Sequence, residues 1–411
     1  MIVERRTLLK AGAAGLAFST LPGAAAYAGR SRKRAYVLVI DGCRPDELDS
    51  GLTPRLAALR GSGLRFPRAA SMPVMETIPN HVMMMTGMRP ARTGVPANSI
   101  YDRRAKAVRD MDRPSDIRCD TIIERLNRRG ATTGTVLSKE YLYGVFGGRA
   151  THRWEPRPTL PVTEHAPDVF TMAAALTMLE ELDPNLMFVN LGDIDRFGHA
   201  DLSGTTLRLA RRLALADTDA QIGRFVDALK ARGTWRDSVL IVLADHSMDW
   251  STPDKVISLT APLAADPLLA GKVQIADNGG ADLLYWTGPA AQRAAAVRRM
   301  RAIALAQPGV LSAYDRRTRG LRLGPQAGDV VAFCKAGWRF SDPDPVTSNP
   351  IPGNHGHPAT RAIPFFISGG HPVVPHRAST RVARTVDVAP TIARFFKVGH
   401  PRGGYDGRPL L

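Results

Sequence analysis

One hydroxyl residue and six carboxylate and imidazole residues have the types and settings that chemistry at phosphorus would need. The hydroxyl residue is Thr77, within the stretch Met75–His81, and its candidate partners are Asp41, Asp195, His199, Asp245, His246 and His355. Zinc binds carboxylate oxygen and imidazole nitrogen. Two zinc ions ~4 Å apart can hold the attacking and leaving oxygens of an in-line displacement. This set predicts Thr77 as nucleophile and two Zn²⁺, or another divalent metal, as cofactors.

Three continuous apolar runs each lead into an acid. They are residues 35–40 before Asp41, 186–191 before Asp193 and Asp195, and 238–243 before Asp245. Such runs are typical of strands buried on both faces of a parallel sheet. Ligands of open α/β sheets sit beyond the carboxyl ends of strands. A single aspartate there could merely cap a turn, but the threefold recurrence favours one shared site.

The remaining ligands come from a helical turn and a loop. Asp195 and His199 are four residues apart, which places both on one face of a helix and favours Asp195 over Asp193 as the ligand. His355 lies in a loop with glycine on either side, Gly353-Asn354-His355-Gly356. His152 and His165 receive no role.

The residues around Thr77 predict a helix that begins beside it. Pro79 suits the first turn of a helix over residues 80–86, whose free N–H groups would then face an anionic phosphoryl group. Asn98 could donate its amide to a phosphoryl oxygen. An ordinary turn asparagine is an equally good interpretation of Asn98.

The chain reads as globular, with 44% hydrophobic and 23% charged residues in 411. It predicts one large catalytic domain, 29–411, with an α+β insertion at about 250–350. Further expected elements are helices over 121–129, 169–182, 205–231 and 388–396 and strands over 132–137 and 364–368. Residues 141–168 are expected to be turn-rich and 256–279 irregular.

Residues 1–28 are interpreted as a signal peptide for twin-arginine export. Arg5 and Arg6 precede a short apolar region, and Ala26-Tyr27-Ala28 is a typical cleavage site. An uncleaved membrane anchor is the alternative, but the apolar run is shorter than the ~20 residues of a spanning helix. No later segment is long enough to span. The expected location is periplasmic, cell-wall-associated or secreted.

The charge favours anionic partners. The formal net charge is +17, and removal of the signal's +2 leaves +15. The arginines are scattered without interleaved aromatics, which disfavours dedicated nucleic-acid recognition and leaves a small phosphate ester or nucleotide as partner. Three cysteines, Cys43, Cys119 and Cys334, imply no disulfide framework. Burial is a better interpretation of Cys43 than a place beside the metal.

The motifs resemble those of the type I phosphodiesterase/nucleotide pyrophosphatase branch of the alkaline phosphatase superfamily. They are VIDG, TIPNH followed by TG and AN, D-x-x-G-H, ADH, NHG and DVAPTIARF, spread over residues 35 to 396. The resemblance implies an α/β fold with a mixed, mainly parallel sheet sandwiched by helices and a smaller α+β cap. Sulfatases need Cys or Ser in C/S-x-P-x-R, and the cofactor-independent phosphoglycerate mutases use serine. Neither fits Thr77.

The resemblance also implies roles for the site residues. Asp41, Asp245 and His246, with Thr77, should hold the zinc that activates the nucleophile. Asp195, His199 and His355 should hold the zinc that serves the leaving oxygen and later the water. Asn98 matches an asparagine that binds a phosphoryl oxygen.

The predicted activity is phosphoester hydrolysis through a phospho-threonine, with a diester or nucleotide pyrophosphate preferred. A monoesterase or phosphonate hydrolase of the same superfamily is the alternative, and Lys139 bears on the choice. Lys139 resembles a substrate-binding lysine of phosphonoacetate hydrolases, but their second cation is replaced here by Tyr141. A solvated Lys139 is an equally good interpretation. A non-catalytic metal- or phosphate-binding protein is disfavoured because no ligand and no nucleophile is missing.

Overall fold

An eight-stranded mixed sheet forms the centre of the computed structural model, which describes residues 32–161, 164–200, 208–343 and 352–411. The strands, in spatial order, are β19 (Arg377–Ala378), β2 (Leu64–Arg65), β18 (Phe365–Ser368), β9 (Ser238–Leu243), β1 (Arg34–Ile40), β8 (Leu186–Leu191), β6 (Thr133–Leu137) and β7 (His152–Trp154). The predicted signal peptide and the first residues of the predicted helix 205–231 lie outside the described residues.

The central strands run parallel. β1 pairs in parallel with β8 and β9, and β6 pairs in parallel with β7 and β8, whereas β18 is antiparallel to β9 and β2. Every residue of β1, β8 and β9 is buried. Strands covered on both faces read as continuous apolar runs, so the predicted mixed, mainly parallel sheet is confirmed.

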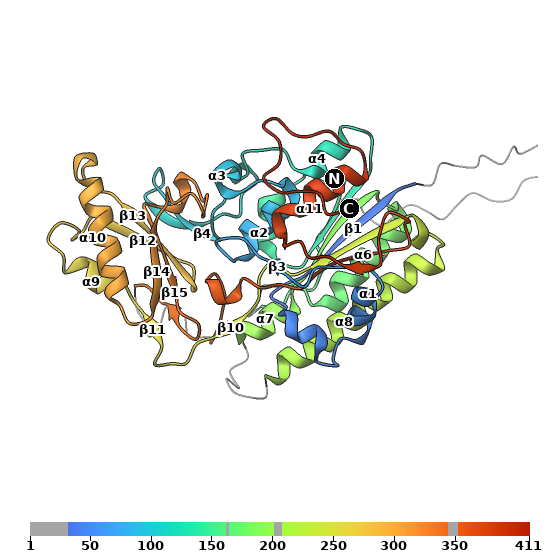
Figure 1. Cartoon of the computed structure of the whole chain (residues 1–411), viewed down its shortest axis with the longest axis horizontal. Coiled ribbons are helices and arrows are strands. Elements are labelled where there is room, and N and C mark those ends of the chain that lie inside the picture. Colours follow the sequence, from blue (N-terminus) through green and yellow to red (C-terminus); the bar gives the residue numbers. More distant parts are fainter. Residues whose placement is uncertain (1–31, 162–163, 201–207, 344–351) are drawn as a thin grey trace, which may run out of the picture. The chain divides into compact units, whose positions relative to one another are not determined.

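Helices cover both faces of this sheet, as Figure 1 shows. One layer holds α2 (Thr77–Thr86), α4 (Ile122–Asn127), α5 (Glu140–Phe146) and α11 (Val388–Phe395). The other holds α1 (Pro54–Gly61), α6 (Asp168–Leu182) and α8 (Leu209–Ala231). α2 is buried at all of its residues, which gives the helix that starts at Thr77 a fixed position.

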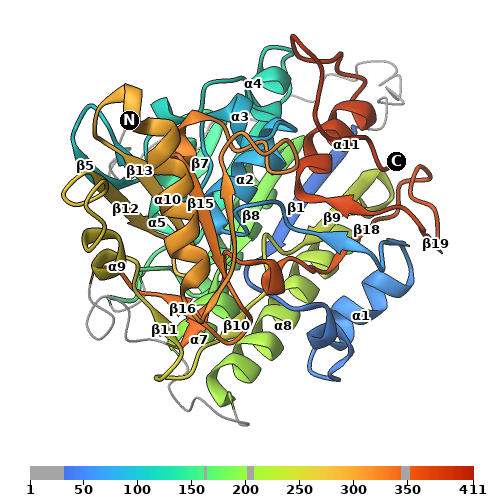
Figure 2. The same ribbon diagram turned by 60° about the vertical axis from the view of Figure 1, so that its left-hand side comes forward.

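A second, antiparallel sheet lies within the range predicted for the insertion (Figure 2). Its strands are β12 (Val273–Asp277), β13 (Ala281–Trp286), β15 (Val330–Cys334) and β14 (Val310–Asp315), and α10 (Arg293–Ala306) packs on it. Trp286, Met300 and Phe340 belong to a hydrophobic cluster on one face of this sheet, whereas Leu283 and Tyr285, on its other face, pack in the cluster of the large sheet. The limits of the insertion at 250 and 350 stay a prediction.

Two stretches are more regular than expected. Residues 141–168 contain most of α5 and all of β7, and residues 256–279 contain β11 (Val256–Ile257), α9 (Thr260–Ala264) and β12. The prediction missed these short elements, but residues 147–151, 155–161 and 265–272 are irregular, as expected. Short elements of this kind are stabilised by tertiary packing rather than by local propensity.

Candidate active site

The carboxyl ends of three adjacent strands bring three acids together. Asp41 follows β1, Asp245 follows β9, and Asp195 lies in the first turn of α7 (Asp193–Ala200), directly after β8. All three side chains are buried. The strand ends therefore create a single pocket of negative charge in the interior.

Two groups of side chains within this region could each hold a metal ion. One is Asp41, Asp245 and His246, and the other is Asp195, His246 and His355; in each, the ligand atoms lie within 4.8 Å of one another. His199 Nε2 lies 3.4 Å from Asp195 Oδ1 and so borders the second group. The six predicted ligands are thus neighbours, but His246 stands between the groups rather than in the first alone.

The free acceptor atoms of the carboxylates fit bound cations. Asp41 Oδ1, Asp195 Oδ1 and Asp245 Oδ2 are buried and have no hydrogen-bond partner. The second oxygen of Asp41 accepts from Asn190 Nδ2 at 2.8 Å, and that of Asp245 accepts from the Gly42 and His246 N–H groups. Buried polar atoms normally have partners. One held oxygen and one open oxygen per carboxylate is the arrangement expected of monodentate metal ligands.

The imidazoles are also oriented for metal binding. His199 Nδ1 lies 2.8 Å from the Gly353 carbonyl oxygen, and His246 Nδ1 lies 3.0 Å from the Ser247 carbonyl oxygen. An Nδ1–H that donates to a carbonyl leaves the Nε2 lone pair available to a cation. The donor set of oxygen and nitrogen atoms fits zinc.

Burial dominates the proton equilibria of the site. It lowers the pKa of His246 to about 4 and, together with the neighbouring His246 and His199, lowers the pKa of His355 well below its usual range. Burial and Asp245 raise the pKa of Asp41. Burial opposes ionisation of Asp195 as well, but Lys139 and His199 outweigh it and hold its pKa well below the ordinary value. Neutral imidazoles are the form that binds metal.

Thr77 is the first residue of α2 and lies beside the shared histidine. Its Oγ1 is 3.1 Å from His246 Nε2, and its side chain is buried. The preceding Glu76 has extended backbone angles, so the helix begins at Thr77, as predicted. The hydroxyl therefore faces the position that both candidate metal groups border.

Asn80 and His81 fix the loop that carries Thr77. The Asn80 amide donates to the carbonyl oxygens of Met72, Val74 and Glu76. His81 Nδ1 lies 2.9 Å from the Thr77 carbonyl oxygen. The sequence analysis quoted both residues within a motif but gave them no role.

Asn98 supports the start of α2 with its side-chain oxygen. Its Oδ1 accepts from the Ile78 N–H at 2.9 Å, which leaves the amide nitrogen to donate elsewhere. The Asn80 N–H donates to the Glu76 carbonyl oxygen, and Pro79 has no N–H. Of the N–H groups in this first turn, at most that of Thr77 remains free to donate to a phosphoryl group. The sequence had led us to expect several. The role of Asn98 toward substrate stays a prediction.

Lys139 is buried between the two metal groups. Its Nζ lies 2.8 Å from Asp41 Oδ2 and 2.7 Å from Asp195 Oδ2, and the side chain is 0% exposed. The alternative of a solvated lysine is wrong. The ammonium is directed at two carboxylates and not into the cavity. Contact between Lys139 and a substrate therefore stays a prediction.

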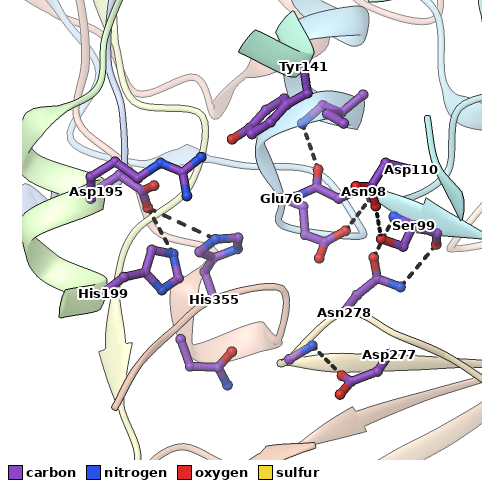
Figure 3. Close-up of a pocket in the computed structure, with 14 residues that line it drawn as sticks. Glu76, Asn98, Ser99, Asp110, Tyr141, Asp195, His199, Asp277, Asn278 and His355 are labelled. Carbon is purple, nitrogen blue, oxygen red and sulfur yellow. Dashed lines mark hydrogen bonds and ion pairs between the residues drawn. The ribbon is translucent and has the colours of Figure 1, made fainter. Parts of the chain in front are cut away.

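A cavity of about 260 Å³ opens beside the candidate ligands. Figure 3 shows Asp195, His199 and His355 on one side and Glu76, Asn98, Ser99, Asp110, Asp277 and Asn278 on the other. Asp277 ends β12 of the second sheet, and Ser99 and Asp110 belong to the hairpin of β4 (Ser99–Asp102) and β5 (Ala107–Asp110). The cavity is therefore walled by parts of the chain that lie far from the ligands in sequence.

Four residues that line the cavity received no functional role from the sequence: Glu76, Tyr141, Arg196 and Asp277. Glu76 lies in the stretch around Thr77, Arg196 follows Asp195, and Tyr141 was noted only as the replacement of a cation. No pattern near Asp277 marked it. Burial raises the pKa of Glu76 to about 8, although its carboxylate accepts from the Asn98 N–H.

Asp193 is directed away from the candidate ligands. Its carboxylate meets His165 Nε2 at 2.7 Å and the Asp168 N–H at 3.1 Å, so it joins β8 to α6. His165, which received no role, has this structural one.

The three cysteines carry free thiols. Cys43 is buried, and burial raises its pKa well above the usual range, so its sulfur is a protonated thiol rather than a metal-binding thiolate.

No helix in the described part of the chain combines the length and the apolar composition that a membrane span requires.

Among curated proteins, the chain is 24% identical over 242 residues to a bis(5′-adenosyl)-triphosphatase ENPP4 from Bos taurus, and this match covers 56% of the chain. It is 22% identical over 247 residues to human ectonucleotide pyrophosphatase/phosphodiesterase family member 5, covering 57% of the chain. The matches span about half the length of these relatives, 50% and 49%.

Solved structures resemble the whole fold. Murine ectonucleotide pyrophosphatase/phosphodiesterase 5, in complex with AMP, superposes with a TM-score of 0.72 at 18% identity over 89% of this chain and 96% of its own. The phosphonoacetate hydrolase of Sinorhizobium meliloti, in complex with phosphonoformate, superposes with a TM-score of 0.68 at 19% identity over 90% and 95%. These similarities confirm the predicted fold class.

The family model of type I phosphodiesterase/nucleotide pyrophosphatase matches residues 35–358, which include every candidate metal ligand. The chain therefore belongs to the type I phosphodiesterase/nucleotide pyrophosphatase family.

Proposed function

We propose that the chain is an exported, zinc-dependent phosphoester hydrolase that acts through a phospho-threonine on a phosphodiester or nucleotide pyrophosphate. The observation that carries the proposal is the 3.1 Å approach of Thr77 Oγ1 to His246 Nε2, since His246 belongs to both candidate metal groups. A hydroxyl placed between two cation sites is the arrangement needed for attack at phosphorus.

Asp41, Asp245 and His246 would hold one zinc and Asp195, His199 and His355 the other, and together these ions would supply positive charge to the attacking and leaving oxygens. The Thr77 hydroxyl loses its proton and Oγ1 bonds to phosphorus while the bond to the leaving oxygen breaks, and that oxygen takes up a proton. Asn98 donates its amide to a phosphoryl oxygen. Water then attacks the phospho-threonine from the vacated side and releases phosphate or a phosphate monoester.

The substrate preference rests on the family and on Lys139. The curated relatives are named as nucleotide-cleaving enzymes, and the ammonium of Lys139 is paired with Asp41 and Asp195 rather than open to a dianionic phosphoryl group. Both points support a diester or pyrophosphate over a monoester or phosphonate. Export by the twin-arginine route rests on residues 1–28 alone.

Metal removal should abolish activity. We expect about two zinc ions per chain by elemental analysis, loss of aryl diester hydrolysis in a chelator, and recovery when zinc is returned. Aryl phosphate diesters, monoesters and phosphonates assayed side by side would test the preference. Full activity in a protein stripped of metal would contradict the proposed site.

Acid should destabilise the metal-free protein through His246. Its folded-state pKa of about 4 lies below the pKa of 6.5 of an ordinary histidine, so the unfolded chain binds more protons between these two pH values. The contribution of His246 to stability is complete above pH 6.5 and is lost as the pH falls toward 4. A shift of this size corresponds to about 3 kcal/mol.

Urea unfolding in chelator at pH 7 and pH 5 measures this effect. The wild type should lose more stability than His246→Gln over the same interval, because the variant lacks the titrating group while neighbouring aspartates titrate in both. Equal losses in the two proteins would show that His246 is not held neutral by the fold.

A further inference from the structure

Arg196 is a cation at the cavity wall for which the described part of the chain supplies no ion pair. It follows Asp195 in α7, its side chain is partly buried, and its Nε is enclosed with no hydrogen-bond partner. No ion pair between the described residues includes Arg196. A guanidinium has five donors in a fixed fork, and here they are available to a ligand.

Other enclosed cations near the site have acidic partners. Lys139 pairs with Asp41 and Asp195, and Arg211 pairs with Glu47 at 2.7 Å. A charge withdrawn from water without a partner is costly. Within the described part of the chain Arg196 is the exception, and its guanidinium lies at the cavity wall, where an oxyanion could reach it.

The guanidinium is held in place against an aromatic ring. Its carbon lies 5.6 Å from the centroid of the Tyr141 ring, within the range of a cation–π contact. Tyr141 and Arg196 both line the cavity next to Asp195, His199 and His355. The Asp195 carboxylate makes no ion pair with Arg196, because its Oδ2 bonds Lys139 and its Oδ1 is directed toward the histidines. Burial opposes the charge of Arg196, but Tyr141 and Asp195 act on it at longer range and raise its pKa.

The opposite wall of the cavity carries the carboxyl groups of Glu76, Asp110 and Asp277, across from Asp195 and its histidines (Figure 3). Burial raises the pKa of Glu76 to about 8 and also raises the pKa of Asp277. Among the described residues that line the cavity, Arg196 is the one lysine or arginine. An oxyanion in the cavity would therefore find its fixed positive charge at Arg196.

We propose that Arg196 binds a second anionic group of the substrate, an oxyanion attached to the phosphoryl group that Thr77 attacks. The proposal rests on the proposed function and narrows its substrate class to phosphoesters or pyrophosphates whose substituent carries a carboxylate or a further phosphate. Both groups present two oxygens to the guanidinium fork in the bidentate geometry that arginine favours. Arg196 is thus a specificity-determining residue, and Tyr141 positions it.

Matched substrate pairs test the proposal and separate the two oxyanions. 2-Phosphoglycolate and ethyl phosphate differ by a carboxylate, and phenyl diphosphate and diphenyl phosphate differ by a phosphate. For Arg196→Met, kcat/KM should fall ~10- to 100-fold for the anionic member of a pair, the loss expected for a charge-assisted hydrogen bond, and stay unchanged for the other. A selective loss confined to one pair would identify that oxyanion as the natural one.

Two further variants serve as controls. Arg196→Lys keeps the charge but not the fork and should recover part of the discrimination. Arg298→Met removes a positive charge from the exposed face of α10 and should alter neither pair. Equal losses for both members of each pair, or no loss at all, would overturn the proposal.

Binding measurements distinguish a failure of the proposed activity from a failure of the proposed role of Arg196. If the wild type cleaves none of the four compounds with metal present, the proposed function fails for these substrates. Calorimetric titration with 2-phosphoglycolate and ethyl phosphate then still decides the role of Arg196, since Arg196→Met should weaken binding of the first alone. Identical binding of 2-phosphoglycolate by wild type and variant would refute it.

Discussion

Replacing Thr77 with alanine is expected to abolish turnover of phosphoesters while the fold and the metal content persist. The change removes one hydroxyl and one methyl group from a buried helix start, and losses of this size cost about 1 kcal/mol. None of the proposed carboxylate or histidine ligands is altered. Loss of a covalent nucleophile lowers kcat by at least about 10³-fold.

Initial rates on an aryl diester, together with zinc analysis and urea unfolding, would measure these three properties. Thr77→Ser is the matched control because it keeps a hydroxyl beside His246, and it should retain measurable turnover and show a burst of the aryl alcohol that the first step releases. An alanine variant as active as the wild type would rule out the phospho-threonine.

Replacing Lys139 with methionine is expected to destabilise the metal-free protein by about 3–5 kcal/mol. The ammonium is fully buried and bonds Asp41 and Asp195, so its loss leaves two carboxylates enclosed without their cation. Methionine has a similar length, which limits the packing defect. The loss of unfolding free energy in this variant therefore measures the effect of the missing positive charge.

Urea unfolding with and without zinc would measure the effect. Bound zinc should reduce the difference between variant and wild type, because the metal supplies positive charge to the same carboxylates. Lys335→Met is the control, since Lys335 is exposed and bonds only the Pro308 carbonyl oxygen. An unchanged stability of the metal-free Lys139 variant would mean that the carboxylates are protonated when the lysine is absent.

The large sheet was predictable because its central strands stand out in the sequence as continuous apolar runs. Residues 35–40, 186–191 and 238–243 are continuous apolar runs, and each is a strand within one residue of the expected limits. The helix at Thr77 was predictable for the same reason: Pro79 and the apolar run after it specify a helix start.

Contacts between residues that lie far apart in the sequence could not be predicted from it. Lys139 is 56 residues from Asp195, and Thr385, whose hydroxyl bonds Asn80 Oδ1 at 2.8 Å, is 305 residues from its partner. No local pattern encodes such contacts, which depend on how the sheet and helices pack. The placement of His246 between both metal groups has the same origin, since it requires His355 to stack on it with ring centroids 3.8 Å apart.

One face of the second sheet, with Leu284 and Trp286, packs in a hydrophobic cluster of its own, whereas the other face, with Leu283 and Tyr285, packs in the cluster of the large sheet. Asp277, at the end of β12, lines the cavity. The six candidate ligands and Thr77 all lie outside the second sheet. A change of side chain at Asp277 can therefore alter the shape of the cavity without replacing any group proposed to take part in the reaction. Substrate preference is thus open to variation in a part of the chain that carries none of the proposed chemistry.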